Sequence, residues 1–145
     1  MPTRDAGNFN TAANNLNRTG TGTHPNLYST KGTPAYGITT QVANFGTWNG
    51  TDGLWTPPYP CGTHTLISKG NVKINSYYLD LPNYPQAVDI SLITHELGHA
   101  EGLGHQTSDP CHLPAVMNPY TSTRRQCNWN TPTADDAMGL RVAYS

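Results

Sequence analysis

The chain begins with apolar residues at a helical spacing. Four of them occupy positions i, i+3, i+4 and i+7 of a single stripe: Phe9, Ala12, Ala13 and Leu16. This pattern predicts a short amphipathic helix over residues 8–17. Because a helix of this length is marginal alone in water, we expect it to pack against a sheet.

Runs that are typical of β-strands follow, with Gly and Pro between them. We predict strands at residues 26–30, 35–45, 63–68 and 72–79. Residues 50–62 include the run WTPPYP, and this density of proline predicts a loop.

The clearest helix is predicted over residues 89–101. Asp89 is expected to cap its start, and Gly102 is expected to end it. Its core face is made of Ile90, Ile93, Leu97 and Ala100.

An irregular stretch is predicted to continue to Asn130, and a closing helix follows it. We expect Thr131 to be its N-cap and Pro132 its first residue, with Asp135 and Asp136 near the positive end of the helix dipole. Three of its residues are expected to pack inward: Ala137, Leu140 and Tyr144.

Composition and charge narrow the classes of function. A chain of 145 residues suits one domain, and 12% charged residues with a net charge of −1 give no support to nucleic-acid binding. No apolar run approaches the roughly 18 residues of a membrane span. The chain has few Lys and Glu and many Thr, Asn, Gly and Pro, a composition that favours a secreted protein. We expect this protein to be a monomer. Residues 1–7 lack an apolar stretch, so a signal and pro-segment are expected to precede them.

The chain contains three cysteines, Cys61, Cys111 and Cys127. Cys111 and Cys127 are a natural pair across a polar loop in an oxidising compartment, which leaves Cys61 as the odd cysteine. Spacing alone does not fix connectivity, so Cys61–Cys111 and Cys61–Cys127 remain alternatives.

The strongest chemical signal is the run HELGHAEGLGH at residues 95–105. Positions four apart on a helix differ by about 40° around the axis and about 6 Å along it, so His95 and His99 can share a metal ion. Gly102 can adopt positive φ and turn the chain so that His105 becomes a third ligand. Three imidazoles leave one zinc position open, which is typical of a catalytic site. Glu96 is placed to meet water at the metal without being a ligand.

The pattern H-E-x-x-H-x-x-G-x-x-H resembles the signature of the metzincin clan of zinc endopeptidases. A methionine turn should follow it, and the run PAVMNPY at residues 114–120 fits, with Met117 as its methionine. The form is most similar to the matrixins, and the resemblance covers about residues 72–144. A Cys111–Cys127 pair is similar to the small bacterial snapalysin-type proteases, which carry Asp where this chain has His105.

The resemblance implies an α+β zincin-like fold. A twisted mixed sheet, the zinc-binding helix, the Met-turn and a C-terminal helix would form one catalytic domain, with sub-domains at about 1–102 and 103–145. The substrate would be a protein or peptide lying extended along an edge strand, for which residues 63–68 are the candidate.

The implied reaction is peptide-bond hydrolysis with one catalytic Zn²⁺ on His95, His99 and His105. Glu96 would be the general base that takes the proton of the attacking water and passes it to the leaving amine. Met117 would pack beneath the metal site. Pro119 and Tyr120 would border the pocket for the residue after the cleaved bond, although Tyr120 could instead reach the zinc or the oxyanion.

Other candidate residues have simpler interpretations. His24, His64 and His112 lack ligand spacing, and Glu101 is expected to be a solvated helix residue facing away from the zinc. The run NGTDG at residues 49–53 could wrap Ca²⁺, but it equally fits an ordinary turn.

Two other classes of function stay open. One is a zinc-containing binding or adhesion domain that has lost catalysis, although a pure binder has no use for Glu96. The other is a zinc hydrolase of a non-peptide amide, against which the Met117 turn argues only through resemblance.

Overall fold

The computed structural model describes residues 3–19, 26–27, 37–58, 70–82, 84–107, 111 and 115–145. In chain order its elements are α1 (Thr3–Arg18), β1 (Ile38–Ala43), the 3-10 turn η1 (Trp48–Gly50), β2 (Gly53–Thr56), β3 (Gly70–Asn75), α2 (Ser76–Leu79), α3 (Gln86–Ala100), α4 (Thr121–Gln126) and α5 (Ala134–Ala143).

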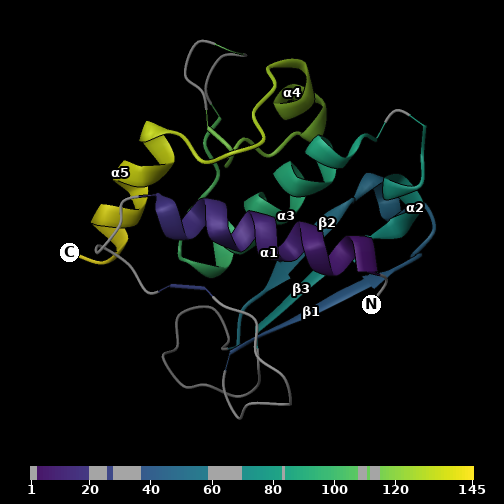
Figure 1. Cartoon of the computed structure of the whole chain (residues 1–145), viewed down its shortest axis with the longest axis horizontal. Helices are drawn as coiled ribbons and strands as arrows, with labels where there is room; N and C mark the ends of the chain where they lie inside the picture. The colour runs from purple at the N-terminus through teal and green to yellow at the C-terminus, as the bar shows by residue number, and fades with distance from the viewer. Residues whose placement is uncertain are drawn as a thin grey trace.

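The described strands form one mixed sheet in the order β1-β3-β2 (Figure 1). β1 is parallel to β3, with Ile38 opposite Gly70, and β2 is antiparallel to β3, with Gly53 opposite Ile74. The predicted α+β class and the mixed character of the sheet are therefore confirmed.

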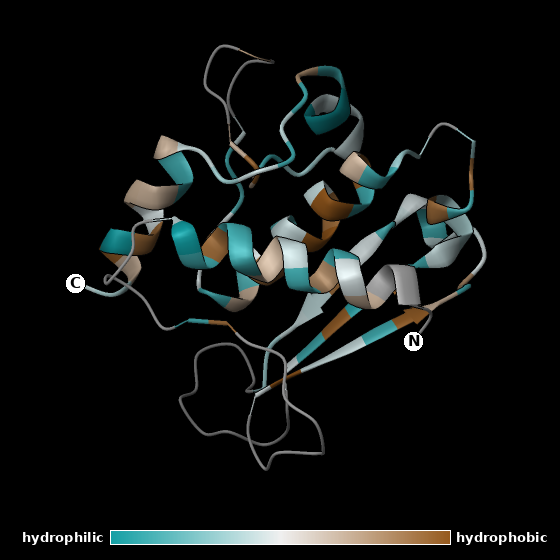
Figure 2. Ribbon diagram, viewed as in Figure 1, coloured by the Kyte–Doolittle hydropathy of each residue, from teal (hydrophilic) through white to brown (hydrophobic). Residues whose placement is uncertain are grey.

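Helix α3 lies between the strands and α4, and α1 packs along α3 (Figure 1). Ala12 and Leu16 of α1 are fully buried against the same core as Val72 and Ile74 of β3, which confirms the predicted apolar stripe. In Figure 2 the apolar positions of α3 and β3 contrast with the hydrophilic α4. This packing holds α3 against the sheet through Leu92, Ile93 and Leu97.

Two predictions in the sheet region are corrected. Residues 72–79 were expected to be a strand, but β3 ends at Asn75 because the Asn75 side chain accepts a hydrogen bond from Tyr77 N–H and caps α2. Residues 50–62 were expected to be loop, yet they contain β2, which pairs with β3 before Pro57. Residues 26–27 lie outside any strand, and the rest of the predicted strand 26–30, like 63–68, lies outside the described residues.

The starts of the two predicted later helices also differ from expectation. α3 begins at Gln86 with Pro85 as N-cap, because the Pro85 carbonyl already accepts from Val88 N–H at 2.8 Å. Asp89 therefore lies inside the helix, where its buried carboxylate accepts a hydrogen bond from Asn8 at 3.4 Å.

The closing helix α5 has Thr133 rather than Thr131 as its N-cap. Thr133 and Asp136 form a reciprocal capping box, so Pro132 precedes the helix instead of opening it. Leu140 is fully buried as expected, whereas Tyr144 is 43% exposed.

α4 interrupts the stretch that was expected to be irregular up to Asn130. Its sequence TSTRRQ has no apolar stripe, so hydrophobic periodicity could not reveal it. Cys127 follows α4 and forms a disulfide with Cys111, with 5.2 Å between their Cα atoms. This pairing confirms one of the three alternatives; Cys61 lies outside the described residues. Among the helices that the structure describes, none is long and apolar enough to cross a membrane.

Candidate metal centre

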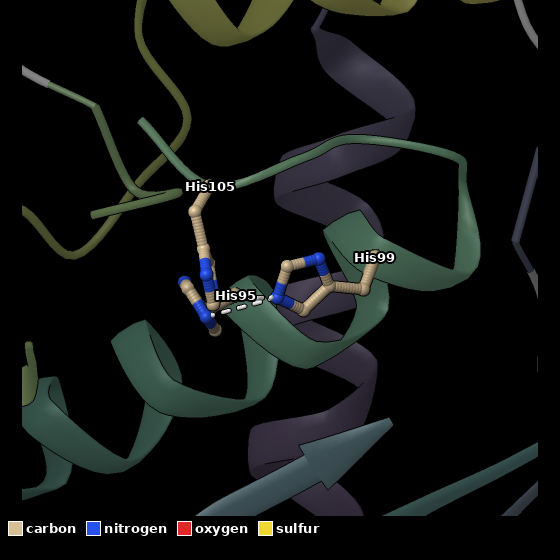
Figure 3. Close-up of side chains that lie close together, drawn as sticks. All are labelled: His95, His99 and His105. Carbon is tan, nitrogen blue, oxygen red and sulfur yellow. Dashed lines mark hydrogen bonds between the residues drawn. The ribbon is translucent and has the colours of Figure 1, made fainter. Parts of the chain in front are cut away.

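Three histidines converge at the C-terminal end of α3. His95 and His99 project from one side of the helix, and the chain reverses after it so that His105 faces them (Figure 3). The reversal takes place at Gly102, whose φ of 91° lies in the left-handed region that favours glycine. The expected role of Gly102 is confirmed.

The ring nitrogens have the spacing of ligands to one ion. His99 Nε2 lies 3.2 Å from His95 Nε2 and 3.0 Å from His105 Nε2. Tetrahedral zinc with Zn–N bonds of about 2.0–2.1 Å requires its ligand atoms to be about 3.3 Å apart. Within the described ranges, this is the only group of three His, Cys, Asp or Glu side chains found close enough to hold a metal ion. The donor set fits zinc, as it fits other ions that accept imidazole.

Backbone carbonyls orient the two helix imidazoles. His95 Nδ1 lies 3.0 Å from Val116 O, and His99 Nδ1 lies 2.8 Å from Leu103 O. A protonated Nδ1 donates to each carbonyl and leaves the Nε2 lone pair for a metal. Both carbonyls belong to segments after α3, so the metal centre depends on how those segments pack against the helix.

The electrostatic surroundings keep these imidazoles neutral. Burial, and next the positive charge of Arg124, lower the pKa of His95 from its ordinary 6.5 to about 2. Burial also lowers the pKa of His99. Because a metal binds the neutral ring, both side chains are in their ligating form at neutral pH.

Glu96 is buried beside the three histidines and lies on the same cleft. Burial raises the pKa of its carboxyl from 4.5 to about 8, against the opposing effect of the Arg124 charge. Gly53 makes room for this carboxyl, because a Cβ atom at that position would lie 2.6 Å from Glu96 Oε1.

A cleft of about 480 Å³ connects these groups. Its walls are β2 with the turn before it, residues 50–55, and the three histidines, Glu96, Pro119 and Arg124. Pro119, expected at the substrate pocket, lies in this lining. Tyr120 does not, and its side chain is 67% exposed.

The turn that contains Met117 lies beneath the histidines. Met117 is 2% exposed, and its sulfur contacts the helix at Gly98. The backbone N–H groups of Val116 and Met117 both donate to the carboxylate of Asp136, at 3.0 and 3.3 Å. Asp136 thus holds the turn whose carbonyl orients His95. Sequence analysis assigned Asp136 only to the helix dipole. The T-x-x-D spacing with Thr133 could have indicated its capping role. Nothing in the sequence indicated its contact with the turn.

Sequence analysis also missed Arg124, and it placed Asp52 only in the candidate calcium run and not on the cleft. Arg124 is 1% exposed and contacts His95, and Asp52 lies on the cleft, where it accepts a hydrogen bond from Tyr84 at 2.5 Å. Burial, then this hydrogen bond, raise the pKa of Tyr84 well above its ordinary value. Nothing in the local sequence indicates that Arg124 is buried or that Asp52 lies beside the histidines.

Of the residues given simpler interpretations, Glu101 needs a correction. It was expected to be solvated, yet it is 4% exposed and accepts a hydrogen bond from Tyr144 Oη at 3.3 Å. In the candidate calcium run, oxygens of Thr51 and Asp52 already accept hydrogen bonds from Asn75 and Tyr84, and calcium there stays a prediction. His24, His64 and His112 lie outside the described residues.

Comparison of the chain with models of protein families, with curated proteins and with solved structures found no match.

Proposed function

We propose that this protein is a zinc-dependent endopeptidase of the metzincin type, closest in form to the matrixins. One observation carries the proposal: three Nε2 atoms converge on one point of an open cleft, with the buried carboxyl of Glu96 on the same cleft. A purely structural metal site would not need a buried carboxyl group beside the ligands.

In the proposed hydrolysis, the metal ion and the side chain of Glu96 have separate roles. When bound, a zinc ion supplies Lewis-acid activation of water and of the scissile carbonyl. Glu96 takes the proton of the attacking water and returns it to the leaving amine. In the metal-free site burial raises the pKa of this carboxyl to about 8, and the positive charge of a bound zinc ion would lower that pKa toward the carboxylate form that acts as a base.

Further features support the metzincin assignment. Met117 packs under α3 at Gly98, where this clan places its methionine turn, and the helix α5 follows that turn in the chain. The Cys111–Cys127 disulfide favours an oxidising compartment and therefore secretion.

The substrate in this proposal is an extended peptide. β2 is an edge strand of the described sheet, and residues 53–55 of it line the cleft. A peptide that adds to this edge would pass in front of the histidines, with backbone hydrogen bonds setting its direction. Residues 63–68, which the sequence favoured for this role, lie outside the described residues, and that prediction stays untested.

The proposal is tested with Glu96→Gln, which keeps the size of the side chain and removes its basicity. We expect the zinc-loaded wild type to cleave casein and the variant to bind one zinc and cleave at least about 100-fold more slowly. Glu101→Gln is the matched control: it changes the chain's other glutamate, which lies off the cleft, and should retain activity.

Other outcomes separate the alternatives. A wild type that holds one zinc and cleaves no unfolded protein would contradict the endopeptidase proposal and favour a binding domain. Hydrolysis of small acyl amides without cleavage of casein would favour a non-peptide amidase.

A further inference from the structure

Arg124 is a buried cation beside the metal centre. Its side chain is 1% exposed, and burial lowers the pKa of its guanidinium. The described part of the chain places no carboxylate within ion-pair distance of it; Asp52 and Glu96 act on it only from farther away. Burying a charge in this way is unfavourable unless hydrogen bonds satisfy it, so its hydrogen bonds indicate what it does.

The guanidinium joins three parts of the protein. Nε donates to Ser91 Oγ of α3 at 3.2 Å, Nη2 donates to Thr121 Oγ1 of α4 at 2.6 Å, and Nη1 donates to the carbonyl of Asn118. Asn118 belongs to the same turn as Val116, the residue whose carbonyl orients His95. Arg124 therefore fixes the distance between α3 and this turn.

The backbone around Arg124 closes the same network. Ser91 Oγ donates to Trp129 O at 2.7 Å, and Trp129 N–H donates to Arg124 O at 2.8 Å. Ser91 and His95 are one helical turn apart on α3, so the network holds the side of the helix from which the first metal ligand projects.

We propose that Arg124 is a positioning residue for the metal centre: by tying Ser91 of α3 to the Asn118 carbonyl, it holds Val116 O where His95 needs it. This inference rests on the metal site of the proposed function. An alternative role, recognition of an acidic substrate side chain, is disfavoured because the guanidinium is almost fully buried and already donates to three acceptors.

The positive charge of Arg124 and its role in positioning His95 predict opposite effects of its removal on zinc affinity. Its Nη1 lies 3.3 Å from His95 Nδ1, so its positive charge opposes a cation on the other side of the ring. If charge were its main effect, its removal would tighten zinc binding. If Arg124 positions the ring, its removal will weaken zinc binding, because the Val116 carbonyl will shift.

The test compares wild type with Arg124→Met and Arg124→Lys, and uses Arg125→Met as control because Arg125 is an exposed neighbour on the same helix. Zinc affinity is measured by competition with a chromophoric chelator. We expect Arg124→Met to bind zinc about 10–100-fold more weakly and Arg125→Met to match wild type. Arg124→Lys keeps the charge but loses the planar fork, so it should also weaken binding, by a smaller factor.

A second readout reports geometry rather than stability. The visible absorption of the Co²⁺-substituted protein depends on ligand arrangement, and we expect its band positions to shift in both Arg124 variants but not in Arg125→Met. If Arg124→Met does not fold, Arg124→Lys carries the test. Two results in the folded Arg124 variants would overturn the inference. One is a wild-type zinc affinity together with an unchanged Co²⁺ spectrum, and the other is tighter zinc binding.

These measurements do not depend on proteolysis. Arg124 variants that bind zinc as wild type does and still cleave casein would remove the positioning role and leave the proposed function intact. A wild type that binds zinc and cleaves nothing would contradict the proposed function. If the Arg124 variants then bound zinc more weakly than wild type, the positioning role would still stand.

Discussion

Gly98 of α3 and Met117 lie in direct contact beneath the metal centre. A Cβ atom at position 98 would lie 2.5 Å from Met117 Sδ, which is closer than real side chains approach. Glycine is therefore required here by packing, since the helix itself would be more stable with alanine. The contact sets the depth at which the turn lies under the two helix histidines.

Gly98→Ala should destabilise the protein by about 1–3 kcal/mol, because the added methyl group must displace Met117 or the helix. Gly7→Ala is the control: Gly7 also lies within a helix, a Cβ there meets nothing within 4 Å, and a gain of up to about 1 kcal/mol is expected. Urea unfolding of both variants gives the comparison, and equal effects would contradict the packing argument.

Gly53→Ala should impair catalysis more than metal binding. The new methyl group would lie 2.6 Å from Glu96 Oε1 and 2.8 Å from Leu92 Cδ1, so the Glu96 carboxyl must swing away. We expect kcat/KM on a peptide substrate to fall about 100-fold with zinc affinity nearly unchanged. Thr56→Ala, at the exposed end of the same strand, should retain activity. Loss of zinc in proportion to activity would point to a wider disturbance.

Glu96 makes the metal-free protein less stable as pH rises. Its folded pKa, about 8, lies above the ordinary 4.5, so its contribution to stability is present below pH 4.5 and is lost as pH rises through 8. Glu96→Gln cannot ionise. With chelator present, the stability advantage of this variant over wild type should therefore grow from pH 5 to pH 8, by up to about 1.4 kcal/mol per pH unit. Urea unfolding at both pH values checks this, and a constant difference would refute it.

Asp136→Ala should lower stability and zinc affinity together. The carboxylate caps α5 and accepts from the backbone of Val116 and Met117, so its loss leaves buried N–H groups unsatisfied. We expect a loss of about 2–4 kcal/mol, against at most about 1 kcal/mol for Asp135→Ala at the exposed neighbouring position. Chemical denaturation and chelator competition measure the two effects. Normal zinc affinity in Asp136→Ala would mean that His95 does not depend on the turn.

Removal of the disulfide should destabilise the protein without altering the metal centre. Cys111 and Cys127 close a loop of 16 positions, and the double variant with serine should lose about 3 kcal/mol of stability. Zinc affinity should stay within about threefold of wild type. Reductant should destabilise wild type and leave the double variant unchanged, because that variant keeps only Cys61. Cys61→Ser should remain as sensitive to reductant as wild type, and loss of that sensitivity would indicate that Cys61 takes part in the pairing.

The convergence of the three histidines could be predicted from the sequence because its geometry is local. His95 and His99 are placed by the helical repeat, and His105 by a glycine three positions before it, so eleven consecutive residues define the ligand set. The apolar stripe of α1 was visible for the same reason, since helix periodicity is a property of neighbouring residues.

The rest depends on contacts between distant segments. β2 is a strand because it pairs with β3, and this pairing could not be predicted from a local sequence rich in proline. Glu101 is buried and accepts a hydrogen bond from Tyr144, which lies 43 positions later in the chain. Arg124 is buried although α4 has no apolar residue, and its burial is explained by the hydrogen-bond acceptors around it, such as Ser91.

The hydrogen bonds of Asp136 have a consequence for the order in which the protein is made. All three histidines leave the ribosome before Asp136, which follows them in the chain. Until α5 is synthesised and folds back, the backbone N–H groups of Val116 and Met117 lack their acceptor, and His95 lacks a fixed carbonyl. A nascent chain can therefore carry all three histidines and still lack the arrangement that brings them together, so synthesis of these residues and assembly of the candidate metal centre are separate events.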